Sequence, residues 1–135
     1  MWHYIESKED VEMLAKILHG FHDCCIKEIK YISGAYVNEN LSMYPVNDQR
    51  RLSVIIQSQV ATPTTYELEF LKLKFAHMYP VDETYTCEIL GAQMVLTDLG
   101  VCWYDSPEVF NGDLQSYCGN IFFASKMRWR ALSGN

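Results

Sequence analysis

Regular alternation of apolar and polar residues in the middle of the chain restricts the fold more than any other feature. In residues 51–60 one face carries mainly apolar side chains, among them Leu52, Val54 and Ile56, and the other face mainly polar ones. Successive side chains of a strand point to opposite sides, so this pattern predicts a strand that buries one face. The turn residues 61–64 then lead directly into a second alternating stretch.

This second stretch, residues 65–78, predicts a long strand near the centre of the sheet. Its alternation changes phase at Phe70-Leu71, and such a change is typical of a β-bulge, so we expect the strand to bend there. Glu67 and Glu69 lie on the outward side, where they suit either exposure to solvent or pairing across strands with basic residues of the last strand. Those basic residues are Lys126, Arg128 and Arg130.

One amphipathic helix is predicted before the strands, at about residues 8–19. Ser7 precedes it and can accept a hydrogen bond from the backbone amide three residues further on. Gly20 follows it and favours a helix end, because glycine adopts the left-handed conformation without a Cβ clash. The apolar stripe of this helix consists of Val11, Leu14, Ala15 and Leu18.

The remaining pattern completes a predicted α+β fold. Further strands are expected at 24–32, 86–97, 101–104 and 120–131, and long loops at 38–49 and 105–119. The sum is an N-terminal amphipathic helix followed by a mainly antiparallel, curved sheet of five to six strands, arranged as a partial barrel or sandwich. A chain of 135 residues supports one core, so residues 1–135 are predicted to form a single domain.

The charge is acidic and unevenly distributed. The formal net charge is −6, and no Lys or Arg occurs between Lys74 and Lys126. A long acidic stretch repels phosphate backbones and attracts cations, so the sequence predicts a basic protein partner and no nucleic acid. The acids in this stretch are Asp82, Glu83, Glu88, Asp98, Asp105, Glu108 and Asp113.

The sequence also predicts a cytoplasmic protein. The N-terminus lacks a basic region followed by an apolar core, and no apolar run approaches the roughly 20 residues of a membrane helix. We therefore expect neither secretion nor a membrane partner. The five cysteines form no CxxC pair, and an odd number of thiols argues against a disulfide framework.

Aromatic and acidic residues gather in the predicted loop after residue 103. Interfaces for basic proteins combine aromatic anchors with carboxylates, so these residues are the predicted binding residues. They are Tyr104, Asp105, Glu108, Phe110, Asp113 and Tyr117.

The segment Phe21-His22-Asp23-Cys24 joins the helix to the first predicted strand and has two interpretations. The first is a structural corner, in which Phe21 fills the core while His22 and Asp23 bind the backbone. The second is a metal or thiol site. Adjacent residues rarely converge as a catalytic triad requires, and no paired metal-ligand spacing occurs. We therefore assign no metal, cofactor or catalytic residue.

A short amphipathic helix, then Phe-His-Asp, then an alternating strand resembles an element of small uncharacterised bacterial proteins. Some of these are similar to immunity proteins of polymorphic toxin systems, and Trp103-Tyr104-Asp105 after a turn is compatible with that group. The resemblance implies a bacterial cytosolic protein that binds a partner. The leading hypothesis is thus a small acidic binding protein that neutralises a basic toxin domain. The alternatives are a scaffold protein that self-associates through a strand edge or aromatic loops, and an enzyme centred on His22, Asp23 and Cys24.

Overall fold

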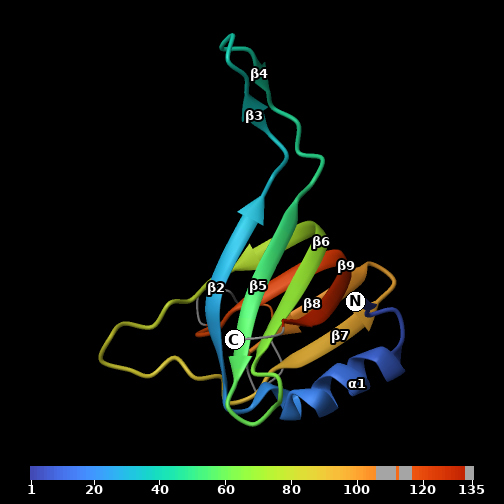
Figure 1. The fold of residues 1–135 in the computed structure, drawn as a ribbon, viewed down its shortest axis with the longest axis vertical. Coiled ribbons are helices and arrows are strands. Elements are labelled where there is room, and N and C mark those ends of the chain that lie inside the picture. Colours follow the sequence, from blue (N-terminus) through green and yellow to red (C-terminus); the bar gives the residue numbers. More distant parts are fainter. Residues whose placement is uncertain (106–111, 113–116, 133–135) are drawn as a thin grey trace.

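The computed structural model describes residues 1–105, 112 and 117–132, and its body is one antiparallel sheet (Figure 1). The seven strands of this sheet are β1 (His3–Tyr4), β2 (Cys24–Ile32), β5 (Arg51–Ser58), β6 (Thr65–His77), β7 (Gln93–Thr97), β8 (Gly100–Tyr104) and β9 (Ile121–Leu132). Six of them follow the order β2-β5-β6-β9-β8-β7, and β1 pairs with β9. Within the described residues β2 and β7 do not pair with each other, so the sheet is open and not a closed barrel.

The helix α1 (Lys8–Ile17) begins as the sequence predicts. Ser7 Oγ accepts a hydrogen bond from Asp10 N at 3.2 Å, and the Asp10 carboxylate accepts one from Ser7 N at 3.0 Å. This reciprocal capping box satisfies amides that the first helical turn leaves unpaired. The α-helix ends at Ile17, slightly earlier than predicted, and a short 3-10 turn, η1 (His19–Phe21), follows it.

The core lies between α1 and the inner face of the sheet. Leu14 and Leu18 are fully buried there, together with the alternating apolar residues of β5. Burial of an aliphatic side chain of this size contributes about 1.5–3 kcal/mol, so this stripe is what attaches the helix to the sheet. The largest fully buried side chains of the core are Trp103, Phe21, Phe70 and Phe122.

The central pairing of β5, β6 and β9 confirms the predicted bend. Lys72 has a φ of +54°, and the register of β6 on β9 shifts between Leu73 and Phe75. The bulge therefore lies just after the residues where the alternation changes phase. The β7–β8 hairpin is also present, with Thr97 paired to Gly100.

Three strand predictions need correction. β1 precedes the helix and raises the number of strands above five to six, because a two-residue strand is too short to show alternation. The strand predicted at 86–97 is present only as β7, since Gly91 and the adjacent apolar pair Ile89-Leu90 break the alternation. The predicted loop 38–49 contains β4 (Met43–Tyr44), which pairs with β3 (Tyr36–Val37) in a separate two-stranded sheet.

Two segments project from the body in different directions (Figure 1). The first, residues 33–49, carries β3 and β4 and is called the arm. The second, residues 78–92, connects β6 to β7 and is called the acidic loop. Isolated two-stranded hairpins are marginally stable, so the arm depends on its attachment to β2 and β5. That attachment is made by Ser33 O, which accepts hydrogen bonds from Gln49 N at 3.0 Å and Arg50 N at 3.2 Å.

Replacement of Gly100 by alanine is expected to lower the free energy of unfolding by about 1–3 kcal/mol, the usual range for overpacking. Gly100 has a φ of +140°, and an added Cβ would lie 2.1 Å from Ala124 O. That oxygen belongs to the backbone of β9 and cannot swing aside. Urea denaturation measures the change, with Gly20→Ala as a control, because Gly20 shares a positive φ but has open space around it. Equal losses for both variants would contradict a clash at Gly100.

Candidate binding surface

The corner between α1 and β2 is strained and tightly packed. His19, Phe21 and Asp23 have φ values of +53°, +65° and +62°, and Gly20 also has a positive φ. The left-handed conformation costs a non-glycine residue about 1–2 kcal/mol. Phe21 is fully buried and lies edge-on to Trp103, with ring centroids 5.6 Å apart. Phe21 therefore fills the core at this corner.

The side chains of His22 and Asp23 form no hydrogen bond with the backbone of any described residue, which corrects that part of the corner interpretation. His22 Nδ1 lies 3.0 Å from Asp23 Oδ2, and the two side chains are 59% and 37% exposed. The backbone itself holds the corner: Asp23 N donates to Ile89 O, and Gln59 N donates to Asp23 O, each at 3.2 Å. An exposed corner satisfies its side chains with each other and with solvent, so backbone partners are not needed.

Cys24 is buried rather than positioned as a nucleophile. Burial raises the pKa of its thiol, which therefore stays protonated at neutral pH. Its Sγ lies 3.8 Å from His22 O, a weak contact with the backbone. Across the described residues, no group of three or more His, Cys, Asp or Glu side chains is arranged to hold a metal ion. At this segment the structure thus shows a buried, protonated thiol at Cys24.

The three predicted binding residues that the structure describes, Tyr104, Asp105 and Tyr117, are buried or half-buried. Tyr104 is buried at the end of β8, and its hydroxyl donates to Gln93 Oε1 at 3.1 Å. Asp105 is half-buried and accepts hydrogen bonds from Asn120 N and Nδ2, both at 2.6 Å, while desolvation raises the pKa of its carboxyl. Tyr117 is half-buried and faces the ring of His77. The predicted residues Glu108, Phe110 and Asp113 lie outside the described residues.

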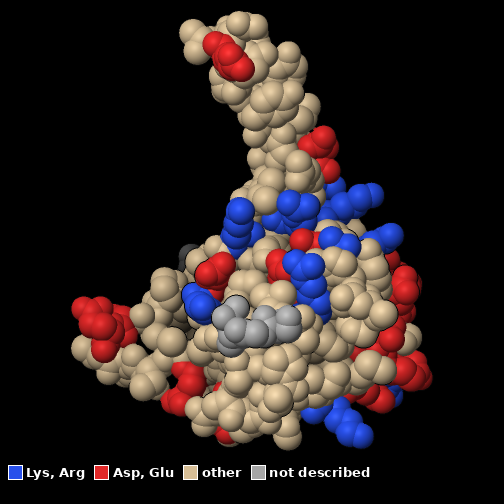
Figure 2. Space-filling model, in the orientation of Figure 1, with Lys and Arg blue, Asp and Glu red and all other residues tan. Residues whose placement is uncertain are grey.

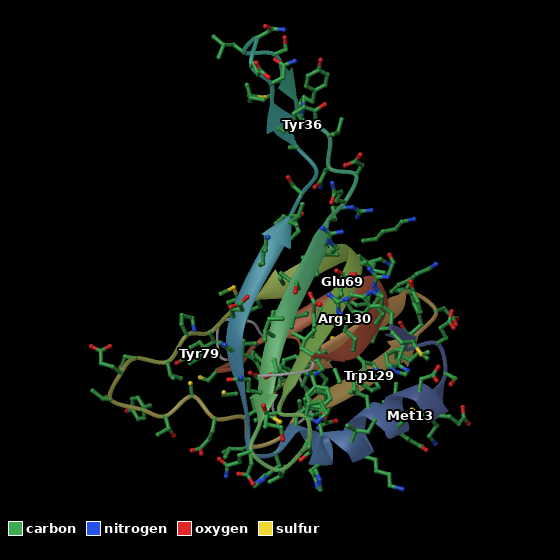
Figure 3. All side chains as sticks on the ribbon, viewed as in Figure 1. Met13, Tyr36, Glu69, Tyr79, Trp129 and Arg130 are labelled. Atoms are coloured by element: carbon green, nitrogen blue, oxygen red, sulfur yellow. The ribbon has the colours of Figure 1, made fainter. Side chains whose placement is uncertain are left out.

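The outer face of the sheet, opposite the core, carries an ion-pair network (Figure 3). Glu69, whose side chain is 7% exposed, binds Arg128 and lies 3.6 Å from Arg51. Glu67 accepts hydrogen bonds from Arg130 Nε at 2.9 Å and Ser53 Oγ at 2.6 Å. The expected cross-strand pairing is therefore present between Glu67 and Arg130 and between Glu69 and Arg128, whereas Lys126 forms no ion pair with a described residue.

Trp2 lies over this network. Its ring centroid is 4.0 Å from Cζ of Arg128 and 4.2 Å from Cζ of Arg130. Arg128 Nη1 also donates to the hydroxyl of Tyr4 at 3.1 Å. The charges of this face are thus used within the protein, where they attach the N-terminal segment to β9.

A cleft of about 400 Å³ lies beside the β7–β8 turn. Lys74 lines it, but its Nζ donates to Leu99 O at 2.5 Å and lies 5.2 Å from the ring centroid of Phe123. The ammonium group is thus already engaged in holding the turn. The lining mixes cations and anions, among them Glu6 and Asp98, and selects no single charge on a ligand.

The acidic loop presents both carboxylates and large apolar side chains to solvent. Asp82, Glu83 and Glu88 are exposed, and none of them forms an ion pair with another described residue. Hydrogen bonds from the hydroxyl and amide of Thr84 lower the pKa of Asp82, which keeps this carboxylate ionised. The exposed apolar side chains of the loop are Met78, Tyr79, Val81, Tyr85 and Leu90.

The sequence analysis missed the extent of this loop because it assigned residues 86–97 to a strand. The signal was nonetheless present: Asp82-Glu83 and Glu88 enclose Tyr85 without any base nearby. Of the other acids of the base-free stretch that the structure describes, Asp98 is in the β7–β8 turn and Asp105 binds Asn120. Figure 2 shows acidic side chains on the projecting loop, apart from the body.

The arm is the second exposed apolar feature. Tyr36 and Tyr44 stack across its two strands, with ring centroids 4.8 Å apart. At its tip Asn38 Oδ1 accepts hydrogen bonds from Asn40 N at 2.9 Å and Ser42 N at 3.1 Å. Between them Leu41 has a φ of +65° and is 86% exposed. The tip thus holds a large apolar side chain in solvent on a strained but well-bonded turn.

No protein-family model matches the chain, and no match was found among curated proteins or solved structures. In the part of the chain that the structure describes, no helix has the length and apolar character needed to span a membrane.

Proposed function

We propose that this chain is a protein-binding module that engages a basic partner through the acidic loop. The observation that carries the proposal is that one projecting segment combines large exposed apolar side chains with three exposed carboxylates that form no ion pair with a described residue. Aromatic side chains supply most of the energy at protein interfaces, and complementary charges supply specificity and a fast association rate. Tyr85, at 70% exposed, is the expected anchor.

The experiment is affinity capture from the source cells with wild-type protein and a loop variant. The variant Asp82→Asn/Glu83→Gln/Glu88→Gln removes three negative charges and keeps the size and shape of the three side chains. We expect wild-type protein to retain a basic partner and the variant to bind it at least about tenfold more weakly, since charge loss at a rim mainly slows association. Calorimetry with the captured partner measures the difference.

The matched control removes three exposed acids outside the loop. The variant Glu9→Gln/Glu28→Gln/Asp98→Asn changes the net charge by the same amount and should bind like wild type. If both variants weaken binding equally, only the net charge matters and the acidic loop is not the binding surface. A captured partner that is acidic would also contradict the proposal.

The resemblance to immunity proteins makes a toxin domain the specific partner that we propose. In that version the acidic loop covers the basic substrate-binding surface of a toxin that acts on nucleic acid. Coexpression with the captured partner should then protect cells from its toxicity, and the loop variant should not. Binding without protection would support the binding module and reject toxin neutralisation.

A further inference from the structure

The arm carries more exposed apolar surface than its own folding requires. The arm contains two charged side chains, Glu39 near its tip and Asp48 near its base, while Leu41 and Met43 are 86% and 67% exposed. The stack of Tyr36 on Tyr44 already stabilises the hairpin through a cross-strand pair. Large apolar side chains on a preorganised turn are suited to binding, because little conformational freedom is lost when they become buried.

Several cations, together with Asp48, lie at the base of this arm. Figure 2 shows Lys and Arg side chains on the viewed face where the arm leaves the body. Lys30 near the end of β2, Arg50 directly before β5 and Lys72 in the bulge of β6 form no ion pair with any described residue, and we call these three the basic collar. The bulge of β6 brings Lys72 close to Arg50, because the neighbouring Leu73 N donates to Arg50 O at 2.8 Å. An occupant of the arm must therefore be apolar at the tip and acidic near the base.

The acidic loop of this chain has that chemistry, since it exposes Tyr79, Tyr85 and Leu90 beside three carboxylates. The arm and the loop of one molecule project in different directions (Figure 1), so they meet only between two copies. We propose that the arm of one copy docks on the acidic loop of a second copy, with the basic collar against Asp82 and Glu83.

A strand edge is a less suitable contact for self-association. The outer edge of β2 carries Lys27, Glu28 and Lys30, and its register shifts between Ile26 and Glu28. Charges and bulges on an edge strand prevent another strand from pairing with it. The contact between copies therefore depends on side chains of the arm and the loop, not on extension of the sheet at β2.

The proposal does not depend on a foreign partner, but it uses the same loop as the proposed function. A second copy and a basic partner therefore compete for the acidic loop. Self-association lowers the fraction of loops available to the partner, and the partner dissociates the assembly. Addition of the captured partner should reduce the amount of self-associated protein in proportion to the complex formed.

Reversed charges test the contact between copies. One variant, Lys30→Glu/Lys72→Glu, has an acidic collar and an acidic loop. The other, Asp82→Lys/Glu83→Lys, has a basic collar and a basic loop. Each variant alone should repel itself and stay monomeric, whereas an equal mixture should associate, because each collar then meets a loop of opposite sign. Light scattering and native mass spectrometry report the masses, and assemblies of the mixture must contain both variants.

Wild-type protein should self-associate in a concentration-dependent way, and about tenfold or more weakly when salt screens the exposed charges. Leu41→Ser/Met43→Ser should also abolish association, and circular dichroism checks that this variant folds. A monomeric wild type at all concentrations, or a mixture that stays monomeric, overturns the inference. A monomer that still captures a basic partner refutes this inference alone. Association of the mixture, combined with failure of affinity capture to recover any basic partner, refutes the proposed function alone.

Discussion

Phe21→Ala is expected to lower the free energy of unfolding by about 3–5 kcal/mol, the usual cost of removing a fully buried phenylalanine. Phe21 is 0% exposed and lies against Trp103, which is also fully buried. Its removal leaves a cavity between α1 and the sheet. The alanine must also keep the positive φ of the corner, so this substitution does not relieve the backbone strain.

Urea denaturation followed by tryptophan fluorescence measures this loss, because Trp103 reports directly on the packing beside Phe21. Met13→Ala is the matched control, since Met13 lies on α1 but is 54% exposed. Met13→Ala should lower the free energy of unfolding by no more than about 0.5 kcal/mol. Equal losses in the two variants would show that Phe21 does not anchor the corner.

Glu69→Ala is expected to lower the free energy of unfolding by about 3–5 kcal/mol, the range for removing one partner of a buried ion pair. Glu69 Oε1 accepts a hydrogen bond from Arg128 Nε at 2.6 Å, and its side chain is almost fully buried. Without the carboxylate, Arg128 keeps its desolvation cost and loses its main anion. The hydroxyl of Tyr4 and the ring of Trp2 remain as its contacts, but neither carries a negative charge.

A double-mutant cycle separates this pair from the rest of the network. Arg128→Ala should lower the free energy of unfolding less in the Glu69→Ala background than in the wild-type protein. In that background the substitution also removes the buried charge of Arg128 that Glu69→Ala leaves without a partner. Glu28→Ala is the control, since Glu28 is exposed on β2 and forms no ion pair with a described residue. Strictly additive losses for Glu69 and Arg128 would contradict an energetic coupling between them.

Local patterns explain why much of the fold follows from the sequence. The start of α1 depends on Ser7 and Asp10, which lie three residues apart, and the alternation in residues 51–58 depends on neighbouring side chains alone. The phase change at Phe70-Leu71 likewise marks the bulge at Lys72. Such signals concern a few consecutive residues and are visible before any packing is known.

The alternation in the last strand does not predict correctly which of its residues face the core. The alternation of Lys126, Arg128 and Arg130 places Phe123 on the inner face, but Phe122 is fully buried and Phe123 only half-buried. The pairing of β9 changes along its length, since Ala124 faces Leu73 and Phe123 faces Phe75. A shift in register reverses which residues face the core, and it depends on the partner strand rather than on β9 alone.

The sequence by itself determined the helix, the antiparallel strands, the central bulge and the acidic character of residues 75–125, because each depends on neighbouring residues or on composition. Only the tertiary structure decided which acids are available for binding: Asp105 is bonded to Asn120, whereas Asp82, Glu83 and Glu88 project into solvent. It also brought Arg50 and Lys72 together at the base of an exposed apolar arm. Exposure and charge pairing depend on contacts between residues far apart in the chain, and local sequence patterns do not contain them.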